Sequence, residues 1–517
     1  MNRTPLFAVI AATAMLILPS AHADAHIYGL TCSNSGSDNL QGALTGGASW
    51  TAIDGGAGGA ATVAPGDIVE LTRLCQGDVL VAKNGLPITG VTITNSTDSE
   101  TFGSDGINGQ VEVKNAQLTL QGLVLESGQN GDVMTNGEVA NVFAHDGASV
   151  TLSGDSVEGG PLIGVYILRG SSGQILSTTV DSVGASNIAK EDDGIRIEGS
   201  STAVVARSSG PSTTISNNGG NGISLVAGSS LELFDSTVQD NAGVQIFANN
   251  ASTAHINASG VTITTSPTLA PLIEAFGASS VTIDGTSFVQ DQGGNAPAAL
   301  LVAGASSAVL NAATLSTTGV VAPVAEASAN SSLILAGGNS ITATGANGMA
   351  VQIDHSSSLL HQQGTFFGYS DGAESVSGRG AVLVQSSIEL GQGPVASGFG
   401  MVWNGGIAVG QNSALRMQSG VHVTGAVQIS AASNGYFNCN NNGNSCSGTG
   451  AQNEIDGTVE CLELVASPDN PSVHVSNPQL IVNSSQAAGS GVVGPANLFG
   501  PSSFANTSET ANTCLNF

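Results

Sequence analysis

Short apolar stretches alternate with polar turns along most of the chain, and one phrase recurs. It consists of a small residue, a serine, a short strand of alternating apolar residues, a polar turn and one further apolar residue, as in SSLELFDSTV from Ser229. Similar phrases begin at Ala148, Ser171, Ser200, Ser252, Ser279, Ser306, Ser331, Ser357, Ser386 and Asn412. They recur about every 26 residues, a period that is typical of solenoid proteins.

Each copy of the phrase supplies two strands, because side chains alternate across a strand and only every second one faces a core. In the copy from Ser229 these inward positions are Leu233 and Val238. A third strand precedes the serines, as in GISL at residues 222–225. The pattern therefore predicts a coil of three short strands, repeated about a dozen times.

Such coils resemble those of the right-handed parallel β-helix proteins, the pectate-lyase-like superfamily. The stretch SNNGGNGISLVAGSSLELFDSTVQDN, residues 216–241, reads much like one of their coils. The resemblance implies an all-β fold, a single-stranded right-handed parallel β-helix. The right-handed rule for parallel crossovers agrees with this handedness.

The N-terminus has the features of a signal peptide. One positive charge, Arg3, precedes an apolar run over residues 5–19 that is too short to cross a bilayer, and small residues suited to cleavage follow at 21–23 and 23–25. We assign residues 1–23 to this signal and expect export to the periplasm or out of the cell. No later segment has the length of a membrane-spanning helix.

The remaining chain divides into three parts: residues 24–105 as an N-terminal cap with the first turns, 106–435 as the β-helix, and 436–517 as a cysteine-containing C-terminal cap. Six cysteines lie near the two ends, where an exported protein forms disulfides. Sequence proximity alone pairs Cys32 with Cys75, Cys439 with Cys446, and Cys461 with Cys514. Their spacing does not resemble a zinc ribbon, so we expect no metal site there.

Acidic residues greatly outnumber basic ones, 38 against 10, which gives a formal net charge of −28. Nucleic acid is therefore not an expected partner, because phosphate binding requires a basic surface. The same charge disfavours a long groove for polyuronates unless cations bridge the like charges. The sequence leaves the oligomeric state open.

The densest cluster of charge is KEDDGIRIE at residues 190–198. Lys190, Asp192, Asp193 and Arg196 are candidate catalytic residues, because two carboxylates and a guanidinium in a turn before a strand could act on a glycosidic bond. A Ca²⁺ site is equally open. The stretch EDDGI resembles the Asp-Asp motif of polygalacturonases, although that family's Gly-His-Gly and Arg-Ile-Lys motifs have no counterpart here. The alternative is a salt-bridged turn in which Arg169 stacks over Glu198.

Outward residues of the third strand should form a column across successive coils. We place Tyr166, Arg196, Ser224, Gln245, Glu274, Leu301, Ala325, Gln352, Leu383 and Ala408 in it. Tyr166, Gln245, Glu274 and Gln352 are candidate ligand-binding residues, because they could stack on a sugar chain or hydrogen-bond to it. An ordinary solvated strand face is the alternative.

Two functions follow. The first is non-catalytic binding of a polysaccharide, a cell-surface glycan or a partner protein along the long uniform faces of the solenoid. The second, implied by the activities of the resembling superfamily, is a carbohydrate-active enzyme: a polysaccharide lyase, a glycoside hydrolase or an epimerase. Low charge and the absence of complete catalytic motifs favour binding.

Overall fold

The structure is a computed structural model. It describes residues 26–32, 40–44, 51–52, 63–82, 90–95, 105–126, 140–160, 162–184, 192–263, 270–290, 298–317, 323–344, 348–361, 374–391, 400–417, 420–430, 433–438, 454–455, 459–462, 479–483, 492–493 and 497–499. The predicted signal peptide lies outside these residues. No helix in the described part of the chain has the length and apolar character needed to cross a membrane.

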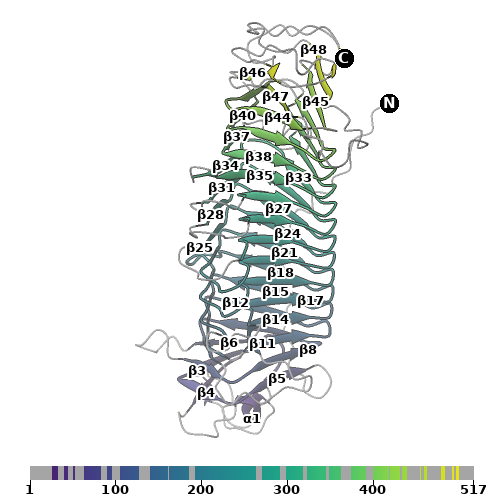
Figure 1. Ribbon diagram of the computed structural model, residues 1–517. Helices are drawn as coiled ribbons and strands as arrows, with labels where there is room; N and C mark the ends of the chain where they lie inside the picture. The colour runs from purple at the N-terminus through teal and green to yellow at the C-terminus, as the bar shows by residue number, and fades with distance from the viewer. Residues whose placement is uncertain are drawn as a thin grey trace, which may run out of the picture.

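The described strands form three long sheets, which are the three faces of a rod of stacked coils (Figure 1). The first sheet has 19 strands: β1 (Ile27–Thr31), β2 (Thr51–Ala52), β3 (Ile68–Thr72), β6 (Val91–Asn95), β9 (Gln117–Gln121), β12 (Ser149–Ser153), β15 (Ser172–Leu176), β18 (Thr202–Ala206), β21 (Ser230–Phe234), β24 (Thr253–Asn257), β27 (Ser280–Asp284), β30 (Ser307–Asn311), β33 (Ser332–Leu335), β36 (Ser358–His361), β39 (Ser387–Leu390), β42 (Ala414–Met417), β45 (Asn434–Asn438), β48 (Gln479–Asn483) and β50 (Asn497–Phe499).

The second sheet has 15 strands: β4 (Leu74–Gln76), β7 (Gly106–Asn108), β10 (Val124–Glu126), β13 (Ser156–Glu158), β16 (Thr179–Asp181), β19 (Thr214–Ser216), β22 (Thr237–Gln239), β25 (Gly260–Ile263), β28 (Ser287–Gln290), β31 (Thr314–Thr317), β34 (Ser340–Ala343), β37 (Glu374–Ser377), β40 (Met401–Asn404), β43 (Val421–Val423) and β46 (Glu454–Ile455).

The third sheet has 16 strands: β5 (Val79–Ala82), β8 (Val111–Lys114), β11 (Ala140–His145), β14 (Ile163–Leu168), β17 (Ile195–Glu198), β20 (Ile223–Val226), β23 (Ile246–Ala248), β26 (Ile273–Ala275), β29 (Leu300–Val302), β32 (Ala325–Ala327), β35 (Met349–Ile353), β38 (Arg379–Val382), β41 (Ile407–Val409), β44 (Val427–Ser430), β47 (Val459–Leu462) and β49 (Val492–Val493). One strand of each sheet makes up a coil, so the predicted all-β parallel solenoid with three strands per coil is confirmed.

The core is a set of apolar columns inside the rod. Leu233, Ile256, Ile283 and Leu310 pair in register along the first sheet, and all four are fully buried. These are inward positions of the recurring phrase. Parallel pairing also joins β1 to β3 and β45 to β48, so the ladder extends into the ranges assigned to the two caps.

The serine of the phrase has a structural role that the sequence alone did not assign. Ser252 Oγ accepts a hydrogen bond from the backbone N–H of Ser229 at 3.3 Å, and Ser279 Oγ accepts one from Ser252 N at 3.2 Å. The same bond links Ser279 to Ser306 and Ser306 to Ser331. This internal serine ladder satisfies backbone donors at a buried turn, where an unpaired N–H would be costly.

The N-terminal end of the rod is closed by several contacts. The disulfide between Cys32 and Cys75 confirms that predicted pair. In α1 (Leu40–Leu44), Leu40 and Leu44 are buried, and Gln41 Oε1 accepts a hydrogen bond from the backbone N–H of Leu80 at 2.6 Å. That bond pairs a backbone group on the first strand of the third sheet, a place where an open edge would invite association.

The other two predicted disulfides stay predictions. Cys439, Cys446 and Cys514 lie outside the described residues, and Cys461 lies in β47 with its side chain undescribed.

Candidate functional site

The outer face of the third sheet carries the predicted column of residues, but some of its positions are occupied by other residues than we predicted. Tyr166, Arg196 and Ser224 pair in register as expected. The next strand then places Phe247 beside Ser224, whereas Gln245 lies in the turn before β23. Further along, Glu326 and Ala381 occupy the positions that we had given to Ala325 and Leu383.

The placement of Gln245 on the exposed column was therefore wrong. Gln245 is fully buried, and its Oε1 accepts a hydrogen bond from Asn241 Nδ2 at 2.7 Å, while its Nε2 donates to the carbonyl of Asn241 at 3.0 Å. The strand begins after Gln245, so its side chain packs into the turn instead of standing on the sheet. Its amide completes a chain of buried asparagines that includes Asn218.

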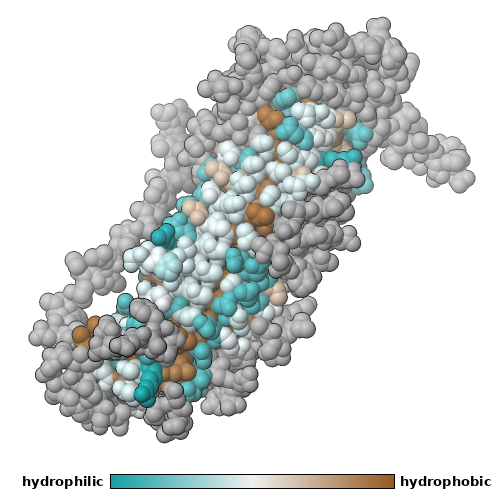
Figure 2. Space-filling model, turned by 90° about the vertical axis from the view of Figure 1, so that its left-hand side faces the viewer, coloured by the Kyte–Doolittle hydropathy of each residue, from teal (hydrophilic) through white to brown (hydrophobic). Residues whose placement is uncertain are grey.

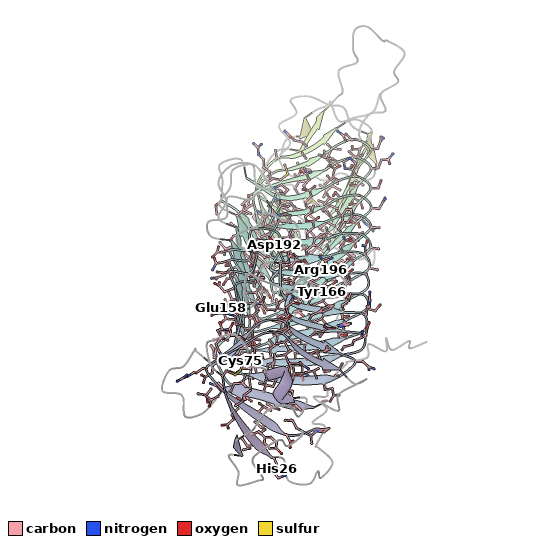
Figure 3. The ribbon with its side chains drawn as sticks, turned by 90° about the horizontal axis from the view of Figure 1, so that it is seen from below. His26, Cys75, Glu158, Tyr166, Asp192 and Arg196 are labelled. Carbon is pink, nitrogen blue, oxygen red and sulfur yellow. A yellow bond between two sulfur atoms is a disulfide. The ribbon has the colours of Figure 1, made fainter. Side chains whose placement is uncertain are left out.

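Tyr166 and Arg196 do lie together (Figure 3). They are at the centre of a group that we call the Tyr166 cluster: Phe143, His145, Tyr166, Arg196 and Glu198. The ring of Tyr166 stacks on Phe143 with centroids 5.2 Å apart, and the Arg196 guanidinium lies 5.7 Å from the centre of the Tyr166 ring. Glu198 Oε2 accepts hydrogen bonds from Tyr166 Oη at 2.9 Å and from Arg196 Nε at 3.0 Å. Although Tyr166 points outward, only 2% of it is exposed, so its ring is not open for stacking on a sugar.

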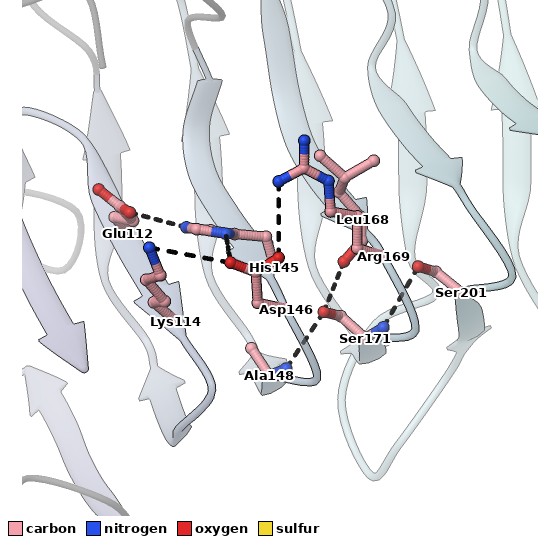
Figure 4. A network of polar contacts seen from close by, with 9 residues as sticks. All are labelled: Glu112, Lys114, His145, Asp146, Ala148, Leu168, Arg169, Ser171 and Ser201. Carbon is pink, nitrogen blue, oxygen red and sulfur yellow. Dashed lines mark hydrogen bonds and ion pairs between the residues drawn. The ribbon is translucent and has the colours of Figure 1, made fainter. Parts of the chain in front are cut away.

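A second row of charge continues from this cluster toward the N-terminus (Figure 4). His145 Nε2 lies 2.7 Å from Glu112, and Asp146 contacts His145, Arg169 and Lys114. Burial acts to raise the pKa of Asp146, but the hydrogen bond and charge of His145 and the charges of Arg169 and Lys114 outweigh it and hold the pKa below its usual value. The Arg169 side chain thus pairs with Asp146, whereas we had predicted that it stacks over Glu198.

The two acidic candidate catalytic residues are buried. Asp192 is fully buried and Asp193 is 2% exposed. Asp193 Oδ1 accepts a hydrogen bond from Asn221 N at 3.0 Å. Burial raises the pKa of Asp193, opposed by hydrogen bonds from Ser224 and Asn221 and by the charge of Arg196. The fourth candidate, Lys190, lies outside the described residues.

The described part of the chain has no group of three or more His, Cys, Asp and Glu side chains that could hold a metal ion. The Ca²⁺ hypothesis therefore finds no ligand set there. Glu274 and Gln352 lie on the column as predicted, both half-buried, but Leu301 and Glu326 separate them. Burial raises the pKa of Glu274.

A hollow of about 370 Å³ opens on the same outer face farther along the rod, over β35, β38, β41 and β44. Its lining consists of two glycines, three alanines, Met349, Ile407, Gln428 and Arg379. Ala381 and Ala408 pair in register, so two successive coils place only methyl groups on the column. Sequence reasoning missed this hollow, although the small residues Gly380, Ala381, Gly406 and Ala408 would have indicated it once the register was known.

Residues 79–263, about a third of the chain, match the family model described as right handed beta helix region. Together with the parallel solenoid, this match confirms the resemblance to right-handed parallel β-helix proteins and is consistent with the pectate-lyase-like superfamily. Neither the curated proteins nor the solved structures gave a significant match.

Proposed function

We propose that this right-handed parallel β-helix is an exported, non-catalytic glycan-binding protein that uses the outer face of its third sheet. The observation that carries the proposal is the hollow over β35 to β44. Arg379 and Gln428 give it hydrogen-bonding groups, but the described residues of its lining have no side-chain carboxyl, imidazole, thiol or hydroxyl group. Glycoside hydrolysis requires a pair of carboxyl groups, so this lining suits binding better than catalysis.

The candidate catalytic residues near the Tyr166 cluster also favour binding over catalysis. An acid or base must reach the reacting group of a substrate. Asp192 and Asp193 are buried in a turn, and Arg196 is bound to Glu198, so these groups serve the packing of successive coils.

The outer face of the second sheet offers a further surface suited to a neutral hydroxylated ligand. Its outward positions include Thr214 and Thr237 in two successive coils and, after Gly260, Ser287, Thr314 and Ser340 in the next three. Figure 2 shows this side of the molecule as a mostly pale surface of intermediate hydropathy. Hydroxyl groups both donate and accept hydrogen bonds, as sugar hydroxyls do.

A glycan array followed by calorimetry tests the proposal. We expect binding of at least one glycan, with no new reducing ends and no unsaturated product after prolonged incubation. Ala408→Leu should fill the hollow and abolish binding without changing the melting temperature, whereas Ala414→Leu, on the outer face of the first sheet, should change neither. Turnover that Asp193→Asn abolishes would establish the enzyme alternative instead.

A further inference from the structure

Arg379 differs from most of the described cations in having no partner for its charge. Lys114 and Arg169 contact Asp146, Arg196 contacts Glu198, and Arg416 contacts Glu389. The side chain of Arg379 is exposed and makes no ion pair or hydrogen bond with another described residue. Arg379 lines the hollow, where no described residue pairs with its charge.

The described side chains that line the hollow beside Arg379 are neutral. On the column beside it, Ala381 and Ala408 are flanked by Gln352 on one side and Gln428 on the other. The nearest acidic residue of that column toward the N-terminus is Glu326, beyond Gln352. An anion bound in the hollow would therefore meet Arg379 and Gln428, whereas a run of anionic groups would extend past Gln352 toward Glu326.

Two glycines at the end of the hollow have no room for a side chain. Gly405 has a φ of 152°, and a Cβ atom added there would lie 2.1 Å from the carbonyl oxygen of Gly378. A Cβ at Gly406 would lie 2.8 Å from the carbonyl oxygen of Ala426. Successive coils thus pack too closely for a side chain at either position, and Gly406 adds no side chain to the lining of the hollow.

We propose that the hollow is a subsite for a single anionic sugar unit, bearing a carboxylate or a sulfate, within an otherwise neutral glycan. This inference rests on the proposed function and names its ligand class. A guanidinium binds such oxyanions through two parallel hydrogen bonds. A polyanion is excluded because the chain carries a net charge of −28 and Glu326 lies on the path of an extended ligand. The volume lies at the low end for small-molecule sites, which suits one sugar unit.

The test compares four probes by calorimetry: an oligosaccharide ending in glucuronate, its carboxyl-reduced counterpart ending in glucose, the latter with one sulfate, and polygalacturonate. We expect one or both singly charged probes to bind about tenfold more tightly than the neutral one, the gain of one charge-assisted pair. Arg379→Gln should remove that difference, Arg379→Lys should retain part of it, and Arg416→Gln, on the outer face of the first sheet, should leave both affinities unchanged.

The outcomes separate this inference from the proposed function. Equal binding of charged and neutral probes, or tightest binding of polygalacturonate, overturns the ligand class while glycan binding stands. If no glycan binds at all, the proposed function fails, and the anion site is then tested alone with free glucuronate and inorganic sulfate. In protein labelled with ¹⁵N-arginine, a shift of the Arg379 side-chain signal that Arg379→Gln removes would support the site, and no shift would overturn it.

Discussion

One face of one sheet is built in two ways. In the N-terminal coils the outer face of the third sheet carries Phe143, Tyr166 and Arg196. Tyr166 stacks on Phe143 and lies under Arg196, and both Tyr166 and Arg196 donate hydrogen bonds to Glu198. In the C-terminal coils the same face carries Ala381 and Ala408 beside the exposed Arg379. Where acids and bases lie within bonding distance they satisfy one another and stabilise the coils. Where small residues surround an arginine without a described partner, its guanidinium remains able to bind a ligand.

The buried interior shows the same division. Every buried carboxylate among the described residues precedes Gly194: Asp67, Asp105, Glu112, Asp155, Asp192 and Asp193. In later described coils the buried polar positions are taken by serine, threonine, asparagine, glutamine and His361. The charge-rich stretch at residues 190–198 thus includes buried carboxyl groups that belong to the scaffold, so a high density of charge in the sequence does not by itself indicate an active site.

Tyr166→Ala should have the largest effect and test whether the cluster is structural. Removing this buried ring should lower the local free energy of unfolding by about 3–5 kcal/mol, because the cavity cannot close between paired strands. Hydrogen exchange of β14 and β17 measures the loss locally, which suits a solenoid whose coils contact only their neighbours. Tyr166→Phe should lose only the bond to Glu198. Unchanged exchange in Tyr166→Ala would show that the cluster is not structural.

The buried carboxylates predict the next largest effect, at Asp155. Its Oδ1 accepts a hydrogen bond from Leu123 N at 2.8 Å, and burial raises its pKa to about 7 against two opposing backbone hydrogen bonds. The folded state therefore keeps a proton that the unfolded chain releases. Stability should fall as the pH rises from 3.8 to about 7, on the order of 2–4 kcal/mol. Asp155→Asn should remove this fall from a plot of melting temperature against pH.

Asn339 provides the matched control in the later coils. It stands just before β34 as Asp155 stands before β13, and its Oδ1 accepts a hydrogen bond from Ala313 N at 2.9 Å. Because both sites are buried, Asn339→Asp should introduce a fall of the same sign. An unchanged pH profile in Asp155→Asn would mean that its carboxyl is already ionised in the fold.

Two glutamates give a smaller contrast. Glu198→Gln weakens the bonds to both Tyr166 and Arg196, so we expect a loss of about 1–2 kcal/mol in the local stability of β17. Glu389→Gln weakens its 3.6 Å contact with Arg416, whose side chain is 47% exposed, and should cost less than about 0.5 kcal/mol. Equal losses in hydrogen exchange would contradict the distinction between the paired cluster and the open surface.

Most of the fold could be predicted because the recurring phrase reports directly on packing. Leu233 and Val238 were placed inward by alternation alone, and both are fully buried. The serine beside each strand was visible, but its bond to the preceding coil was not, because that partner lies 23 or more residues away. Proximity also gave the Cys32–Cys75 disulfide.

The candidate site was harder to predict because coil lengths vary. Ile195 pairs with Ile223 and Ile223 pairs with Ile246, so adjacent coils span 28 and 23 residues. Aligning the coils by sequence similarity therefore placed Gln245 beside Ser224, the position that Phe247 occupies in the structure. The shift by two residues kept the face but moved Gln245 out of the strand, and the hollow near Arg379 appears only once the register is known.

The smallest expected effect on stability separates the two arginines of the face. Arg196→Gln removes its contacts with Glu198 and the Tyr166 ring, so exchange in β17 should quicken by about the equivalent of 1 kcal/mol while glycan affinity is unchanged. Arg379→Gln removes no ion pair or side-chain hydrogen bond with a described residue, so the melting temperature should stay the same while the acidic ligand is lost. The same chemical change thus acts on stability at one end of the face and on binding at the other. Loss of stability in Arg379→Gln would mean that this guanidinium, too, belongs to the scaffold.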